Sequence, residues 1–217
     1  MTRTPTTPAR KAARLRRAAM AAAVATVALT VQIGDGVDAA RRTSSETIAA
    51  EASRAVEALD AWERTQDPAD YVRFVQSREQ TATMTARALD VTPGELRRAW
   101  ADAPSEKQHA VLAAVSQLGV PYKSITSKPG VSFDCSGLTI WAFSEAGIQI
   151  PRVSRDQIRA AESVERADAG AGDLTYYPGH VGIYVGAGLY VHSPEPGHSV
   201  EVTHLPDRSL DFGDPTT

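Results

Sequence analysis

The sequence contains one cysteine, Cys135, and its position suits a nucleophile. It opens a segment, residues 135–146, whose apolar pattern predicts a helix that Gly147 ends. The unpaired backbone N–H groups and the dipole at a helix start favour an anion, so we expect this position to lower the thiol pKa and to populate the nucleophilic thiolate. Without this setting, a lone cysteine would be an inert buried thiol or would pair with another chain.

A thiol nucleophile needs a base, and the candidates are His109, His180, His192, His198 and His204. Period-two apolar patterns predict short strands of one antiparallel sheet over residues 173–177, 180–185, 189–192 and 200–203. His180 and His192 lie on these strands. We expect the other three histidines to be solvated, because they lie in a polar stretch of helix or in and near loops.

The turn Gly186–Gly188 determines how His180 and His192 are placed. A three-residue loop predicts the pairs Val185–Leu189, Ile183–Val191 and Gly182–His192. This register puts the apolar side chains of both strands on one face and the two imidazoles on the other, as diagonal neighbours. A two-residue loop would move Val191 to the face of His180, which the apolar pattern disfavours. The sequence therefore predicts that the two histidines meet.

Cys135, His180 and His192 could together perform two kinds of chemistry. In a hydrolase, His180 activates the thiol and His192 orients the His180 ring. In a zinc site, all three residues would bind the metal. Metal sites more often use closely spaced ligand pairs, and a fourth ligand is missing here. The spacing favours the hydrolase and leaves zinc as the alternative.

The first 39 residues have the composition of an export signal. Basic residues over 3–17 precede an uncharged segment over 18–33, and Val37-Asp38-Ala39 offers small residues for cleavage. The uncharged segment is shorter than the roughly 20 residues of a membrane-spanning helix. We therefore predict a signal peptide over 1–39, a secreted or wall-associated protein and no stable membrane insertion. An uncleaved membrane anchor is the alternative.

Charge argues against nucleic acid as a partner. Residues 1–39 hold six of the 23 basic and two of the 26 acidic side chains, which leaves residues 40–217 with a net charge of −7. A chain this acidic lacks the basic footprint of a nucleic-acid-binding protein. Its length of 217 residues suffices for one catalytic domain and a smaller module.

Residues 40–103 are predicted to form that smaller, helical module, of undetermined role. Apolar spacings of three and four predict a helix around residues 48–62, Asp67-Pro68 opens a second, and Thr92–Glu95 is the capping-box pattern of a third. Ala103-Pro104 marks the boundary with a catalytic domain over 104–217. A helix over 106–118 and later strands predict an α+β domain. The end of the chain, from Pro206, is predicted to be a loose tail.

Six separated blocks within residues 106–205 resemble the NlpC-type family of bacterial peptidoglycan endopeptidases. They are Tyr122, Phe133–Leu138, Pro151–Gln157, Gly172–Leu174, Gly179–Gly186 and Tyr190–Pro194. The resemblance implies a circularly permuted papain-like fold with a small antiparallel sheet and no cofactor. It implies Cys135 as nucleophile, His180 as base and His192 as the residue that orients it.

The resemblance also suggests substrate-binding residues. It implies that Tyr122 lines the cleft near the oxyanion, that Asp134 and Ser136 hold the free amino end of a stem peptide, and that Arg152 is structural or lines the cleft. Residues 123–127 depart from the glycine-rich turn that is usual in the family. Because this loop borders the cleft, the departure bears on substrate preference rather than on the chemistry.

Together these features predict an exported cysteine endopeptidase that cuts peptidoglycan stem peptides between D-glutamate and the following diamino acid. An amidase or transferase on the same fold is one alternative. Another is a non-hydrolytic binding or scaffolding protein that engages an envelope protein through residues 44–103. The presence of Cys135 favours the enzyme.

Overall fold

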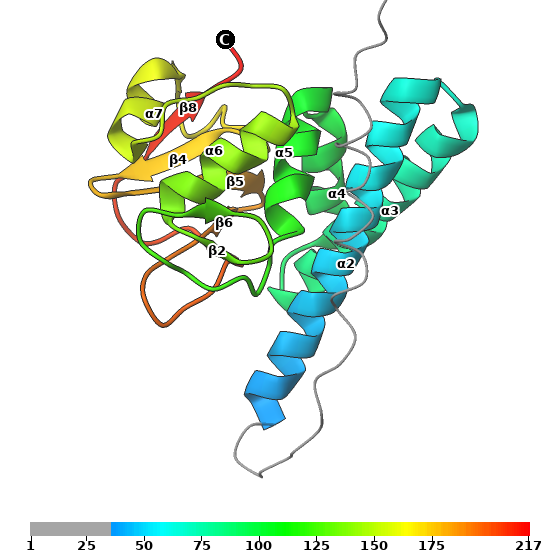
Figure 1. Cartoon of the computed structure of the whole chain (residues 1–217), viewed down its shortest axis with the longest axis horizontal. Helices are drawn as coiled ribbons and strands as arrows, with labels where there is room; N and C mark the ends of the chain where they lie inside the picture. Colours follow the sequence, from blue (N-terminus) through cyan, green and yellow to red (C-terminus); the bar gives the residue numbers. More distant parts are fainter. Residues whose placement is uncertain (1–35) are drawn as a thin grey trace, which may run out of the picture. The chain divides into compact units, whose positions relative to one another are not determined.

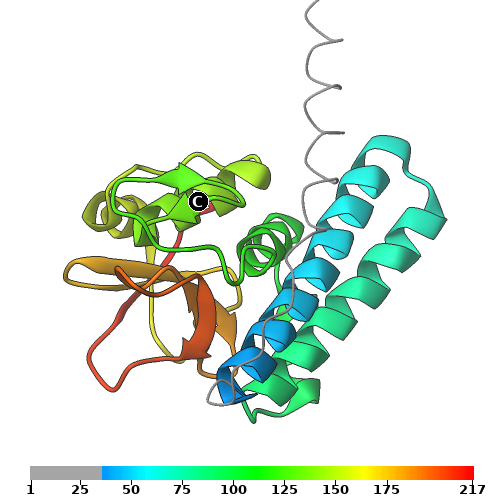
Figure 2. The same ribbon diagram turned by 60° about the horizontal axis from the view of Figure 1, so that its bottom comes forward.

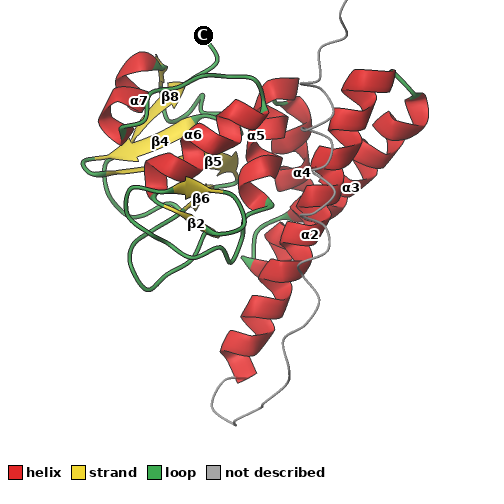
Figure 3. Cartoon of the chain, viewed as in Figure 1, coloured by secondary structure: helices red, strands yellow, loops and turns green. Residues whose placement is uncertain are grey.

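The computed structural model describes residues 36–217, with side chains described from residue 43, and residues 37–217 form one compact unit. Residues 1–35 of the predicted signal peptide lie outside the described residues, and residues 36–39 begin the first described helix. Helices come first in the chain and most strands come later (Figures 1 and 3). This α+β arrangement, with helices ahead of a small antiparallel sheet, is the predicted fold class.

Three helices occupy the predicted helical module: α2 (Gly36–Thr65), α3 (Pro68–Ala88) and α4 (Pro93–Asp102). The long helices α2 and α3 lie side by side as a hairpin (Figure 2). Asp67 caps α3 as predicted, because its carboxylate accepts a hydrogen bond from the N–H of Ala69 at 2.9 Å. Thr92 precedes α4, but its side chain makes no capping hydrogen bond, so the predicted capping box does not form. Along the described part of the chain, every helix is too short or too polar to cross a membrane.

The predicted catalytic domain, residues 104–217 and called the catalytic part below, contains α5 (Ser105–Val115), α6 (Cys135–Glu145) and α7 (Ser154–Ala160). A two-stranded ribbon, β1 (Ser127–Lys128) and β2 (Ser132–Phe133), precedes α6. The main sheet has the order β3-β8-β4-β5-β6-β7, and all of its pairs are antiparallel. Its strands are β3 (Glu162–Val164), β4 (Leu174–Tyr177), β5 (His180–Gly186), β6 (Leu189–His192), β7 (Glu201–His204) and β8 (Asp211–Asp214).

Strand β8 corrects the prediction of a loose tail from Pro206. It lies between β3 and β4, and Phe212 is buried in it. Asp214 at its end accepts a bond from Lys107 Nζ at 2.6 Å, and the same ammonium binds Asp173 at 2.7 Å. Lys107 lies on α5, so this ion cluster joins that helix to the start of β4 and the adjacent end of β8. The sequence analysis missed β8 because Phe212 is its one large apolar residue, and a single apolar residue makes no period-two pattern.

The β5–β6 hairpin follows the predicted register only in part. Ile183 pairs with Val191 as predicted, but Leu189 pairs with Gly186 rather than with Val185. The pairing shifts between Tyr184 and Gly186, where β5 contains an additional residue. The irregularity leaves Val185 fully buried and does not reach the histidine end of the hairpin.

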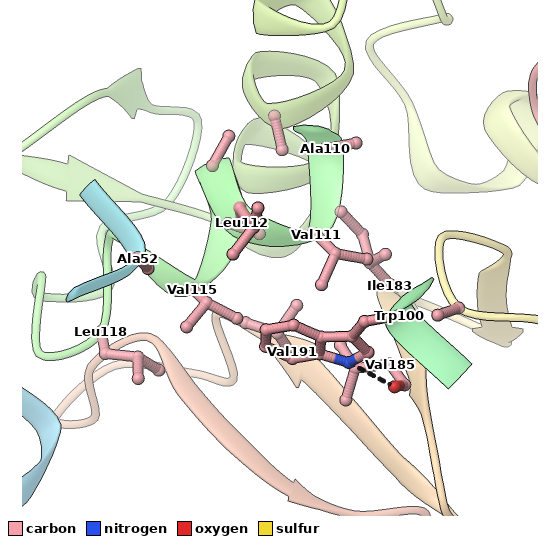
Figure 4. Close-up of a cluster of buried hydrophobic side chains, with 14 of the residues drawn as sticks. Ala52, Trp100, Ala110, Val111, Leu112, Val115, Leu118, Ile183, Val185 and Val191 are labelled. Carbon is pink, nitrogen blue, oxygen red and sulfur yellow. Dashed lines mark hydrogen bonds between the residues drawn. The ribbon is translucent and has the colours of Figure 1, made fainter. Parts of the chain in front are cut away.

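Trp100 of α4 joins the helical part to the sheet. Its indole is 1% exposed, and Nε1 donates a hydrogen bond to the carbonyl oxygen of Val185 at 2.8 Å (Figure 4). Figure 4 also shows Ala52 of α2 beside Val115 and Leu118 of the catalytic part. One apolar core therefore runs through both parts. The boundary at Ala103-Pro104 remains a prediction within this single unit.

Candidate active site

Cys135 is the first residue of α6, as the sequence predicts. Asp134 caps this helix, because its Oδ1 accepts a hydrogen bond from the N–H of Gly137 at 2.6 Å. The loop of residues 123–127 packs on the same turn, where the carbonyl oxygen of Thr126 accepts the N–H of Asp134 at 3.0 Å. A Cβ at position 137 would lie 1.9 Å from that oxygen, so only glycine allows the loop to approach.

The setting of the thiol differs from the expectation of a lowered pKa. Burial raises the pKa of Cys135 above its ordinary value, although hydrogen bonds from the backbone N–H groups of Val181 and Ser136 lower it. The charge of Asp134 adds to the upward shift. Desolvation thus outweighs the helix start. The Val181 contact also shows that β5 brings its backbone to the thiol, one residue from His180.

The two predicted histidines meet in the structure. Nε2 of His180 lies 2.8 Å from Nδ1 of His192, and both side chains are buried. Gly182 stands between them in β5, where a Cβ would approach the His192 Cβ to 3.2 Å and the ring of Tyr190 to 2.6 Å. The prediction that the hairpin register brings both imidazoles together is confirmed.

Glu201, which the sequence analysis did not select, extends the pair. It is the cross-strand partner of His192 in β7, and its Oε1 lies 3.5 Å from Nε2 of His192. A carboxylate there favours the tautomer in which His192 carries its proton on Nε2. Nδ1 of His192 then accepts the Nε2–H of His180. The chain of contacts leaves Nδ1 of His180 without a proton and able to act as a base.

His180 is held neutral in this site. Burial lowers its pKa from the ordinary value of 6.5 to about 4, and the charges of His192 and Arg208 add to the effect. Tyr177 stacks on the ring of His180 with centroids 5.0 Å apart, and the Arg208 guanidinium lies 4.4 Å from the centroid of Tyr177. Tyr177 and Arg208 were also missed. No local sequence pattern identifies these two residues, because Arg208 meets Tyr177 only where the loop after β7 returns to β4.

Three of the four predicted binding residues, Asp134, Ser136 and Arg152, contact one another, whereas Tyr122 lies apart from them. Arg152 donates to Oγ of Ser136 and to Oδ2 of Asp134, each at 2.7 Å. Asp134 is therefore both a helix cap and half of an ion pair. Tyr122 lies apart from this set, where its N–H binds the carbonyl oxygen of His198 at 2.9 Å and its backbone forms a bridge with Phe133.

The other histidines follow the expectation only in part. His198 and His204 are exposed as predicted, but His109 is 5% exposed, so its predicted solvation is wrong. The His109 imidazole faces Asp60 of α2 at 3.6 Å, a neighbour that the spacing within residues 105–115 cannot reveal. As for the zinc alternative, Cys135, His180 and His192 do not form a group of donors within 4.8 Å of one another among the residues with described side chains.

Comparison with known proteins finds similarity over the part of the chain that contains this site. Residues 119–210 match the model of the NlpC/P60 family. A probable endopeptidase of Corynebacterium glutamicum is 36% identical over 143 residues, which cover 64% of this chain and 65% of that protein. A peptidoglycan endopeptidase of Mycobacterium tuberculosis is 38% identical over 133 residues, which cover 54% of each. The chain spans less than two thirds of the length of these relatives.

A solved structure gives a further comparison. An NlpC/P60 family protein from Bacillus cereus aligns with a TM-score of 0.49 and 28% identity, over 52% of this chain and 41% of that one. The corynebacterial alignment is longer than residues 104–217, so it extends into the helical part.

Proposed function

We propose that this protein is a cysteine endopeptidase acting on peptidoglycan stem peptides. Residues 119–210 match the model of the NlpC/P60 family, and one similar protein is named a peptidoglycan endopeptidase. The strongest support is a line of contacts from Glu201 through His192 to His180. His180 is followed in β5 by Val181, whose backbone N–H contacts the Cys135 thiol. Such a line supplies an oriented base to a nucleophile.

In the proposed first step, the neutral thiol attacks the scissile carbonyl carbon while its proton passes to Nδ1 of His180. The raised pKa of Cys135 and the lowered pKa of His180 describe a resting pair in which both groups are uncharged. The proton therefore moves during attack, as general-base catalysis requires. Backbone N–H groups at the start of α6 are suited to stabilise the oxyanion.

The second half returns that proton. The His180 imidazolium protonates the leaving amine, the C–N bond breaks, and a thioester to Cys135 remains. Water then gives a proton to His180 and its oxygen to the carbonyl carbon, which releases the acid and restores the thiol. His192 accepts the Nε2–H of His180 throughout, and Glu201 holds the His192 ring.

The substrate bond and the route to it belong to the same proposal. We place the cut between D-glutamate and the following diamino acid, with Asp134, Ser136 and Arg152 beside the amino-terminal end of the stem peptide. Tyr122 is proposed to line the oxyanion side of the cleft. The basic and uncharged segments of residues 3–33 support export to the wall.

Digestion of purified muropeptides by the wild-type protein, read by mass spectrometry, tests the proposal. Two kinds of fragment are expected: one that ends in D-glutamate and one that begins with the diamino acid. Products cut at another amide would replace the bond but keep the enzyme class. Intact muropeptides after prolonged incubation, together with binding to peptidoglycan, would replace the hydrolase with the scaffolding alternative.

A further inference from the structure

A second histidine site lies at the junction of α2 and α5, away from the catalytic histidines. His109 of α5 faces Asp60 and Glu63 of α2, and one donor atom from each of the three residues lies within 4.8 Å of the others. Among the residues with described side chains, this is the single set of three or more such donors. We propose that these residues form a zinc site that fastens the helical part to the catalytic part.

The state of His109 points to a ligand. Its side chain is buried, yet the described residues provide it with no hydrogen bond within 3.5 Å. Oδ1 of Asp60 lies 3.6 Å from Nε2 of His109. A mostly buried imidazole that faces two carboxylates, without a hydrogen bond to either, is placed as a metal ligand would be. A cation between the three groups would bond all of them.

The geometry suits a small tetrahedral ion. Asp60 and Glu63 are three residues apart on α2, which puts them on one face of the helix. Donors around a zinc ion with bonds of roughly 2.0–2.1 Å lie about 3.4 Å apart. His109 and Asp60 are already 3.6 Å apart, and no pair in the group exceeds 4.8 Å, so the donors need to approach one another by at most about 1.4 Å. The carboxylates can do this, because Glu63 is exposed and the Asp60 side chain is 44% exposed. The buried imidazole can stay in place.

The donor set selects the metal. One imidazole with two carboxylates favours zinc over calcium or magnesium, which take oxygen ligands. Two carboxylates also match the charge of a divalent ion. Three protein ligands leave a position for water on the exposed side of the site. The ion would hold α2 against α5, which packs on α6, the helix of Cys135.

The test is zinc binding to the full chain with Cys135→Ala and no histidine tag, so that neither the thiol nor a tag binds the metal. Titration calorimetry should give one zinc per chain. Zinc at about a hundredfold excess over its Kd should raise the melting temperature by roughly 5–10 °C. Asp60→Asn combined with Glu63→Gln keeps the shapes but removes both ligating charges, and should weaken binding at least about tenfold.

The matched control is the exposed pair His198 and Glu195, whose charged atoms lie 3.9 Å apart. His198→Gln with Glu195→Gln should bind zinc as tightly as the parent. No binding at 100-fold the protein concentration would overturn the proposal. So would binding that survives Asp60→Asn/Glu63→Gln and disappears in His180→Gln/His192→Gln, because the metal would then occupy the catalytic pair. His109→Gln serves as a third ligand variant, checked for folding by circular dichroism.

Discussion

The two buried histidine sites of this protein differ in the partners of their imidazoles. In the sheet, His180 and His192 bond each other, and Glu201 of the next strand approaches the far nitrogen of His192. At the α2–α5 junction, His109 is equally buried but bonds neither of the two carboxylates beside it. The sheet site joins its two imidazoles directly, although Nε2 of His192 is buried without a hydrogen-bond partner among the described residues. The junction site needs something added, and its effect should be on stability.

The largest effect is expected from the thiol itself. Cys135→Ala should lower kcat/KM by at least about 10⁴-fold, because no other group can form the thioester. The melting temperature should change little, since a small side chain that is only partly buried is replaced by a smaller one. Muropeptide turnover and thermal melting measure the two quantities. Activity above a few per cent of wild type in a sequence-verified variant would contradict the role of the thiol.

The histidine pair should behave as one unit. His180→Ala should lower kcat/KM by about 10³-fold and His192→Ala by about 10-fold to 100-fold, since the second acts through the first. The double variant should then be no worse than His180→Ala alone. Losses that multiply would mean that the two imidazoles act separately. Glu201→Gln, which keeps the side-chain size, should give a loss smaller than that of His192→Ala.

Trp100 tests how strongly the helical part is anchored to the sheet that carries the two histidines. Trp100→Ala should reduce the free energy of unfolding by about 3–5 kcal/mol, because it empties a buried site and removes the bond to Val185. Denaturant unfolding measures the loss, and kcat of the folded fraction should stay near wild type. Val72→Ala, at an exposed position of α3, is the control and should change stability by less than about 0.5 kcal/mol.

Asp134, which caps α6, tests how the candidate active site binds its substrate. An ammonium bound by a carboxylate is worth about 1.5–3 kcal/mol, but Arg152 already compensates part of the charge of Asp134. We therefore expect wild type to prefer a free stem tripeptide over its N-acetylated form by only about tenfold. Asp134→Asn keeps the helix cap and should lose this preference. Equal kcat/KM for both peptides with wild type would leave Asp134 as a cap and a partner of Arg152.

The smallest effect is expected from pH. With the pKa of His180 lowered to about 4 and that of Cys135 raised, the neutral pair persists across a wide range. As pH falls through about 4, His180 becomes protonated and can no longer accept the thiol proton, so kcat/KM should drop there. Between about pH 5.5 and 8.5 it should vary less than about threefold. Arg208→Gln removes a charge that lowers the pKa of His180, and should move the acid limb upward. A limb near pH 6.5 in wild type would contradict this environment.

The sequence predicts features that depend on neighbouring residues and misses those that depend on distant packing. The helix that Cys135 begins, the cap at Asp67 and the meeting of His180 with His192 all follow from spacing within one helix or hairpin. The pKa of Cys135 was wrongly predicted because burial by other elements outweighs the helix start. His109 was placed in solvent because its own helix gives no sign of α2. Glu201 could have been identified from the sequence, because pairing the predicted strand over 200–203 with the strand that contains His192 places Glu201 opposite His192.

The ion cluster of Lys107 carries a consequence for the order of folding. Its ammonium binds Asp173 and Asp214, which lie 66 and 107 residues further along the chain. Contacts this distant in sequence slow folding, because a long loop must close before they can form. The α2–α3 hairpin and the β5–β6 hairpin can form early from local contacts, whereas the pairing of β8 with β3 and β4 must wait for the end of the chain. We therefore expect the Lys107 cluster, with the β3–β8–β4 edge of the sheet, to be among the last regions to assemble in a newly made chain.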